Sequence, residues 1–184
     1  MSEAKHVKGY RILAFILALL CAIEIINLLS GRWLNQFSIL PRHAEHLLYI
    51  FTSPFLHGDL AHFTSNIVSL GVLSFLLLQF GVAQYVKVST GVIIISGLLV
   101  WSLGREAYHL GASGLIYGYF GYLVLAGWLS KRLFLALISL LVIVLYGGMI
   151  WGVLPSRPYI SWEFHLFGFI SGLVLAWYLK PARD

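Results

Sequence analysis

Charged residues are scarce in this sequence of 184 residues, since Lys, Arg, Asp and Glu together make up only 10% of it. A typical soluble domain carries about 25% charged residues. Hydrophobic residues reach 60%, and the mean hydropathy is +0.89. So apolar a chain needs lipid as the solvent for much of its surface. Its length allows several membrane spans but excludes a separate large soluble domain.

Cysteine is almost absent, and the single Cys21 lies inside an apolar run. One cysteine excludes an internal disulfide and a cysteine-based metal site, so we expect a lipid-facing or packed side chain. His43 and His46 are the nearest approach to a metal motif. They lack a third ligand and a His-Glu-x-x-His pattern, which disfavours a metalloprotease, and we expect no cofactor. A cleavable signal peptide is not expected, because the first apolar run is as long as a span.

Six apolar segments are long enough, at about 20 residues each, to cross a membrane. In lipid they must be helices, because open strands would leave backbone groups unpaired. The sequence therefore predicts an all-α membrane protein, with a bundle of six transmembrane helices over residues 12–179. An N-terminal segment, 1–11, and a C-terminal tail, 180–184, would flank the bundle. The predicted spans are 12–29, 60–80, 86–103, 113–129, 133–150 and 164–179, of which the fourth and sixth are short.

The basic residues predict the orientation of these spans. The net charge of +5 arises between apolar runs, which indicates topology rather than binding to nucleic acid. With the N-terminus in the cytoplasm, eight basic residues fall inside and four outside, so both termini are expected to be cytoplasmic. The inner set is Lys5, Lys8, Arg11, Lys87, Lys131, Arg132, Lys180 and Arg183, and the outer set is Arg32, Arg42, Arg105 and Arg157.

Two of the predicted outer loops have distinctive compositions. The first, residues 31–59, is long and contains apolar residues together with Trp33 and Tyr49, which favour the headgroup region. We expect a folded element that lies in the outer interface. The last, residues 147–158, is rich in glycine and proline and is expected to be mobile. It would act as a lid over a site at this end of the bundle.

Polar residues open the second predicted span, where such groups are costly and commonly functional. His57 lies just before this span, while His62 and Asn66 lie four residues apart within it. That spacing places the imidazole and the carboxamide on one helix face, where both can donate hydrogen bonds into one cavity. The alternative is a pair of polar residues that bind helices to each other.

Ser113 opens the fourth predicted span, and Gly111 and Gly114 lie on either side of it. A serine at this position is most often an N-cap. However, the glycines allow close backbone approach, and a helix N-terminus offers free N–H groups that could hold an oxyanion. Tyr117 lies one turn further along the same face.

Small residues predict contact between the fourth and sixth spans. Gly114 and Gly118 on the fourth, and Gly168 and Gly172 on the sixth, each form a small-xxx-small face. His165 lies three residues before Gly168 and therefore on the contact face. A serine and a histidine thus meet at similar depth on two helices that are predicted to touch.

This pair suggests nucleophilic catalysis, because a serine hydroxyl needs a base to take its proton and histidine is the usual one. A triad would add a carboxylate to orient the base. Glu163 is two residues from His165, on a nearly opposite face, and nothing directs Asp59 towards that histidine. The sequence therefore predicts a Ser113–His165 dyad, with Tyr117 packed against the imidazole.

These groups, in this order, resemble the rhomboid family of intramembrane serine proteases. The resemblance covers about residues 52–172, and the six-span layout is similar to the family's basic form. The matching motifs are His57-x4-His62-x3-Asn66, Gly111-x-Ser113-Gly114-x2-Tyr117 and His165-x2-Gly168-x3-Gly172.

The resemblance implies a role for each of these residues. Ser113 would be the nucleophile and His165 the base. The Ser113 amide would form the oxyanion hole together with His62 and Asn66. Tyr117 would stack on the base, and a further residue, His57, would help hold the outer loop and water near the site.

One position departs from the family pattern. Many members carry Trp-Arg in the first outer loop, with the arginine three residues before a threonine. Here the threonine is Thr52, and the pair is Leu48-Tyr49. That pair is not catalytic, so the difference concerns how the loop is anchored.

The resemblance implies an enzyme in a prokaryotic plasma membrane, with its active site open to the outer side. Its substrates would be single-span membrane proteins. The alternative is an inactive rhomboid-like protein that binds membrane clients, although such relatives usually lose the serine or the histidine. A transporter or channel is disfavoured by the small size and by the scarcity of acids within spans, of which Glu24 is the clearest.

Overall fold

The computed structural model describes residues 3–155 and 160–179, and this part of the chain is helical. Its α-helices are α1 (Glu3–Leu29), α2 (Leu60–Leu78), α3 (Val82–Leu103), α4 (Ser113–Ser130), α5 (Leu133–Tyr146) and α6 (Trp162–Tyr178). Short 3₁₀ helices lie between them: η1 (Trp33–Phe37), η2 (Ala44–Ile50), η3 (Ser53–Phe55) and η4 (Gly147–Val153). In these residues the only strand-like pairing is an isolated bridge between Ile39 and His109.

The helix ends lie close to the predicted ones, apart from the start of α1. This helix begins at Glu3 rather than near residue 12. The apolar run fixes where a membrane span begins, but backbone hydrogen bonding continues the helix into the polar residues before it. Of the basic residues used to predict topology, Arg157, Lys180 and Arg183 lie outside the described residues, as does the tail 180–184.

Four helical segments in the described residues are long and apolar enough to cross a membrane: Val7–Leu29, Leu60–Leu78, Val82–Leu103 and Leu133–Val153. The protein is therefore an integral membrane protein. Helices α4 and α6, expected as short spans, are not among the four. Most of α4 is buried by protein, including its glycines and tyrosines, so its surface does not have to be apolar throughout.

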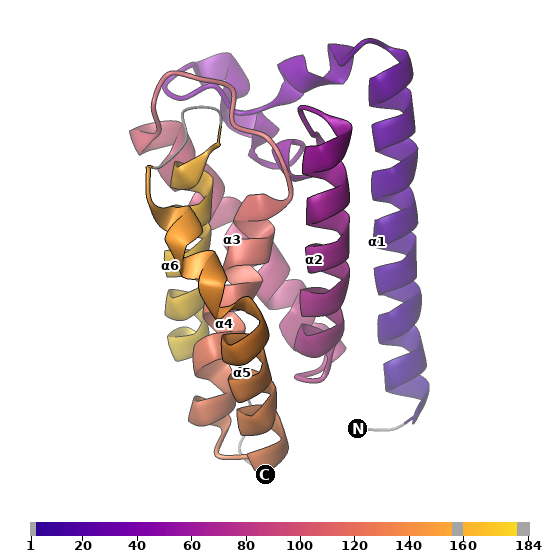
Figure 1. Ribbon diagram of the computed structural model, residues 1–184, viewed down its shortest axis with the longest axis vertical. Helices are drawn as coiled ribbons and strands as arrows, with labels where there is room; N and C mark the ends of the chain where they lie inside the picture. Colours follow the sequence, from indigo (N-terminus) through magenta and orange to yellow (C-terminus); the bar gives the residue numbers. More distant parts are fainter. Residues whose placement is uncertain (1–2, 156–159, 180–184) are drawn as a thin grey trace.

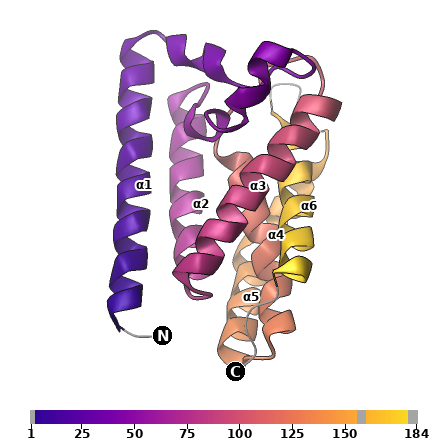
Figure 2. The same cartoon turned by 180° about the vertical axis from the view of Figure 1, so that it is seen from behind.

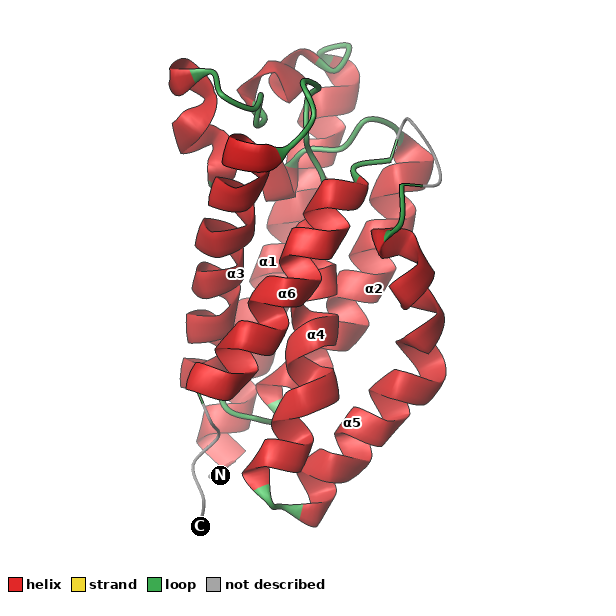
Figure 3. Ribbon diagram, turned by 90° about the vertical axis from the view of Figure 1, so that its left-hand side faces the viewer, coloured by secondary structure: helices red, strands yellow, loops and turns green. Residues whose placement is uncertain are grey.

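The helices are arranged around α4, which lies at the centre of the bundle (Figures 1 and 3). Its most extensive contact is with α6, followed by α5, while α2 and α3 also pack against it. Helix α1 stands at one edge and packs mainly on α2 (Figure 2). The buried core runs through this centre and includes Leu73, Leu77, Tyr119 and Leu123.

The first loop is a folded element of three 3₁₀ helices, η1 to η3, as predicted. It closes the end of the bundle opposite the N-terminus (Figure 1). The Thr52 hydroxyl donates to the Phe37 carbonyl at 2.5 Å, and the Ile39 amide donates to the Ser53 hydroxyl at 2.9 Å. These bonds anchor the segment at which the family's Trp-Arg pair is replaced. Leu48 itself is 72% exposed, and Tyr49 packs edge-on against the Phe37 ring.

The segment after α5 is where the predicted fifth span, 133–150, overlaps the loop over 147–158 that is expected to be mobile. Residues 147–153 continue the chain from α5 as helix η4, because Gly147 and Gly148 can adopt helical angles and proline enters only at position 155. The remainder of the predicted lid, including Ser156 and Pro158, lies outside the described residues.

Candidate active site

Ser113 is the first residue of α4, and the backbone before it is shaped by Gly111. The φ angle of Gly111 is +118°, a conformation that L-residues with a side chain rarely adopt. A Cβ at this position would lie 2.7 Å from the His62 imidazole and 3.8 Å from the Ser113 hydroxyl. The imidazole and the hydroxyl therefore border the same point of the backbone. No side chain caps α4, so the N–H groups of its first turn remain available as donors.

His57 holds the segment that leads into Ser113. It is buried, and its Nε2 accepts a hydrogen bond from the Ala112 amide at 3.4 Å. Burial lowers the pKa of His57 to about 3, with the neighbouring His62 and Arg32 adding to the effect. The imidazole is therefore neutral at neutral pH, and its lone pair can accept this bond.

A polar cluster at the end of α1 fixes His57 in turn. Three side chains donate to the His57 carbonyl: Arg32 and Asn35 at 3.2 Å and Asn27 at 3.4 Å. Arg32 also pairs with the buried Glu24 at 2.6 Å. Sequence reasoning counted Glu24 only as an acid within a span and Arg32 only as an outer basic residue. No local spacing signals their pairing, because Arg32 lies beyond the end of α1 in a left-handed conformation.

Helices α4 and α6 meet at glycines, which confirms the predicted contact between their small-residue faces. A Cβ at Gly168 would collide with the Gly114 carbonyl, and one at Gly172 would collide with the Gly118 carbonyl. The two backbones are thus in direct contact. His165 lies one turn before Gly168, and Ser113 directly precedes Gly114.

The His165 imidazole is held from two sides. Its Nδ1 lies 2.9 Å from the Gly152 carbonyl of η4, and the Tyr117 ring stacks on it with centroids 4.1 Å apart and planes 8° apart. A carbonyl can only accept, so Nδ1 carries the proton and Nε2 of the neutral ring keeps a free lone pair. Sequence reasoning missed Gly152, for which the only signal was its place in a glycine-rich connection.

His62 and Asn66, the α2 residues of the first motif, lie close to the segment that leads into Ser113 or to each other. His62 borders Gly111, as described above, while the Asn66 amide donates to the His62 carbonyl at 2.7 Å. Asn66 is thus bonded to the backbone of α2, and its side chain is nearly fully buried. Asp59 caps α2 by accepting from the His62 amide at 2.7 Å.

Glu163 and Ser113 have separate surroundings. Glu163 is buried and pairs with Arg105 of the α3–α4 connection, at 3.4 Å from its Nε. The Ser113 hydroxyl is largely buried and makes no hydrogen bond to His165 in the described structure. Catalytic hydrogen bonds are commonly long without substrate and tighten when it binds.

Comparison with known proteins identifies the family. Residues 44–182 match the model of the Rhomboid domain. Uncharacterized proteins of Mycobacterium bovis and Mycobacterium tuberculosis are 34% identical over 187 residues, which cover 96% of this chain and 78% of theirs. One of Mycobacterium leprae has the same identity, with 74% of its length covered. With its helical bundle and matching domain, this chain belongs to the rhomboid family.

Proposed function

We propose that this protein is an intramembrane serine protease that hydrolyses peptide bonds in or next to transmembrane segments of other proteins. The hydrogen bond from His165 Nδ1 to the Gly152 carbonyl carries the proposal. It leaves Nε2 as the basic nitrogen on the helix that contacts the start of α4, where Ser113 lies.

In the proposed reaction, Ser113 Oγ attacks the carbonyl carbon of the scissile bond. His165 Nε2 takes the hydroxyl proton as the bond forms and then gives it to the leaving amine. Water enters next and attacks the acyl carbon while Nε2 takes its proton; the bond from that carbon to Ser113 Oγ then breaks, Nε2 returns the proton to Oγ, and the carboxylic acid product leaves. The Gly152 carbonyl and the Tyr117 ring replace the orienting carboxylate of a triad, because they fix both the tautomer and the plane of the imidazole.

The oxyanion of the tetrahedral intermediate would lie at the N-terminus of α4. Its donors would be the Ser113 amide, the His62 imidazole and the Asn66 amide group. The uncapped first turn supports this proposal, since its N–H groups point out of the helix and its dipole favours negative charge. Asn66 would have to leave its bond to the His62 carbonyl to donate, so we assign it a weaker share.

The proposal includes an orientation. All six helices would cross or enter the membrane, with residues 1–11 and 180–184 in the cytoplasm and residues 12–179 forming the protease domain. The active site would open to the outer side of a prokaryotic plasma membrane. Its substrates would be single-span membrane proteins, and nucleic acid would play no part.

A labelling experiment tests the proposal. Purified protein is treated with a fluorophosphonate probe and separately incubated with a model transmembrane substrate. We expect the probe on Ser113, with labelling and cleavage lost in Ser113→Ala and in His165→Ala. Ser65→Ala is the matched control, because Ser65 is an exposed serine of α2 whose change should alter neither. Cleavage that persists in Ser113→Ala, or that stops on chelation of metals, would contradict the dyad.

A further inference from the structure

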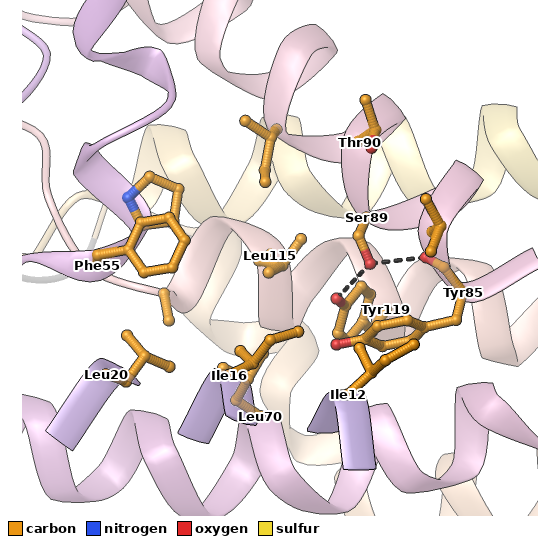
Figure 4. Close-up of a pocket in the computed structure, with 14 residues that line it drawn as sticks. Ile12, Ile16, Leu20, Phe55, Leu70, Tyr85, Ser89, Thr90, Leu115 and Tyr119 are labelled. Atoms are coloured by element: carbon orange, nitrogen blue, oxygen red, sulfur yellow. Dashed lines mark hydrogen bonds between the residues drawn. The ribbon is translucent and has the colours of Figure 1, made fainter. Parts of the chain in front are cut away.

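A cavity on the side of the bundle away from α5 has no role in the proposed protease mechanism. It measures about 180 Å³ and is enclosed by α1, α2, α3, α4 and η3 (Figure 4). Ile12, Ile16 and Leu20 of α1 form one wall, and the α3 wall includes Val86 and Thr90. At its deep end the cavity reaches Ala112, the neighbour of Ser113.

The cavity opens between α1 and α3. Val86 is 49% exposed and Thr90 is also exposed, so the α3 rim is not covered by protein in the described structure. Helices α1 and α3 make few direct contacts with each other and stand apart in Figure 2. Both belong to segments that are long and apolar enough to cross the membrane, so the opening faces lipid.

The size and lining of the cavity define its occupant. An apolar cavity of about 150 Å³ remains dry and can accept a hydrocarbon ligand. A helix, at about 10–12 Å in diameter, is too wide to enter. The α1 wall extends from Ile12 to Leu20, eight residue steps or about 12 Å along the axis, which suits an extended hydrocarbon chain.

Positive charge lies at one end of this opening. Lys8 is one turn before Ile12 on the same face of α1, and Arg11 directly precedes Ile12; both are exposed. On α3, Lys87 follows Val86 and is also exposed. Position 9 of α1 packs beside Val82 of α3, so the two helices bring these cations to a similar height.

Glu3 begins α1 at this end, and the other acidic residues that the structure describes lie away from it. They belong to the outer half of α1, to the first loop and α2 start, to the α3–α4 connection and to the start of α6: Glu24, Glu45, Asp59, Glu106 and Glu163. Basic pockets between transmembrane helices favour anionic lipid headgroups.

We propose that this cavity binds one acyl chain of an anionic phospholipid, whose headgroup lies against Lys8, Arg11 and Lys87. The lipid belongs to the leaflet at the end of the bundle where α1 begins and α6 ends. Its acyl chain runs along α1 towards Leu20 and fills the space beside Ala112 and Leu115. The site does not depend on proteolysis, so it can exist whether or not the dyad is active.

Photolabelling tests the occupant. Ser113→Ala protein is placed in phosphatidylcholine vesicles that contain a trace of phosphatidylglycerol with a diazirine on its acyl chain. After irradiation, we expect adducts on the cavity walls of α1 and α3. Thr90→Trp fills the opening and should reduce them severalfold, whereas Leu98→Trp, on an exposed part of α3 outside the cavity, should not. Val86→Trp serves as a second blocking variant, and thermal unfolding checks that each variant is folded.

A headgroup comparison tests the charge. The same probe with a phosphatidylcholine headgroup should give fewer adducts at the cavity. Each of Lys8→Gln and Arg11→Gln should lower the anionic preference by about fivefold, and Lys131→Gln, at the same end of the molecule, should leave it unchanged. Adducts spread evenly over the lipid-facing helices, or unaffected by Thr90→Trp, would overturn the site. Equal labelling by both headgroups would overturn the anionic assignment.

Discussion

The Gly152 carbonyl orients the imidazole of His165, the candidate base. This contact depends on residue 152 having no side chain. A Cβ at this position would collide with the Tyr117 hydroxyl. Gly152→Ala should therefore push η4 away from α4 and break the bond between His165 Nδ1 and the residue 152 carbonyl. Since a displacement of about 1 Å can cost about 10²-fold in rate, we expect a loss of that order in kcat for a transmembrane substrate.

Two variants separate this effect from general damage to η4. Gly148→Ala is the matched control, because a Cβ there meets no atom within 4 Å, and it should retain activity. Tyr117→Phe removes the hydroxyl with which the new methyl collides. Adding it to Gly152→Ala should recover part of the lost rate. Full activity of Gly152→Ala would show that the carbonyl does not orient the base.

His57 should make the protein sensitive to acid. Burial, aided by His62 and Arg32 and opposed by Asp59, lowers its pKa from 6.5 to about 3. The unfolded chain therefore binds this proton more readily than the folded one. Stability is complete above about pH 6.5 and falls as the pH decreases towards 3, by a few kcal/mol for this group. Protonation at Nε2 would also remove the acceptor for the Ala112 amide.

Thermal unfolding of purified protein between pH 7 and pH 4 measures this dependence. His57→Gln lacks the titrating group but keeps an acceptor, so its melting temperature should fall less steeply with acid. His43→Gln, which changes an exposed histidine of the first loop, should retain the wild-type slope. The pKa of buried His109 is also lowered by burial, so the His57 effect is the difference between the wild-type and variant slopes. Equal slopes would contradict the assignment to His57.

At the scale of the helices, the contact between α4 and α6 depends on glycines that face backbone atoms. A side chain at Gly168 would collide with the Gly114 carbonyl, and a carbonyl cannot move aside as a flexible side chain can. Gly168→Val should therefore separate the helices, lower stability by about 1–3 kcal/mol or more, and abolish fluorophosphonate labelling of Ser113.

Gly71 serves as the control for Gly168, because its surroundings leave room for a side chain. A Cβ at Gly71 of α2 would lie 3.6 Å from a methyl group of Leu17, at ordinary contact distance. Gly71→Ala should leave both the melting temperature and the labelling nearly unchanged. If Gly168→Val labels as well as the wild type, the approach of α6 to α4 does not set the position of Ser113.

The helices could be predicted because apolar runs and glycine spacing are local features. Predicted and observed ends of α2 differ only at its C-terminus, residue 80 against Leu78, and α4 begins at Ser113 as expected. The apolar run of the first span could not predict the start of α1, because a helix can continue beyond the membrane. The predicted fifth span, 133–150, covers α5 and the first half of η4, but the apolar run could not predict the change to a 3₁₀ helix at Gly147.

The candidate active site could be predicted only in part, because some of its contacts come from backbone atoms that have no sequence signature. Ser113, His165 and Tyr117 carry side chains with recognisable chemistry at helical spacing. The carbonyl of Gly152 has no such signature, since every residue has one, and only the folded chain brings it to His165. The cluster that holds the His57 carbonyl likewise joins α1, the start of the first loop and the segment between η3 and α2, and no local pattern connects them.

At the scale of the whole molecule, charge and architecture lead to the same orientation. The N-terminus of α1, the α2–α3 and α4–α5 connections and the end of α6 lie at one end of the bundle (Figure 1). The first loop and the α3–α4 connection lie at the other (Figure 2). In the part of the chain that the structure describes, six of the nine basic residues fall at the end where α1 begins, and Lys131 and Arg132 form its short α4–α5 connection. Basic residues in short loops remain in the cytoplasm, so this end should be the inner one.

Reporter fusions measure this orientation in cells. Alkaline phosphatase, which is active only outside the cytoplasm, should be inactive when fused after Lys131 and active when fused after Glu106, in the α3–α4 connection. A fluorescent protein that folds in the cytoplasm should give the reverse pattern. Lys131→Glu combined with Arg132→Glu should raise phosphatase activity at the inner fusion, because it removes the charges that retain this loop. A phosphatase that is active after Lys131 in the wild-type chain would place Ser113, at the opposite end of α4, on the cytoplasmic side, and would reverse the proposed access of substrates.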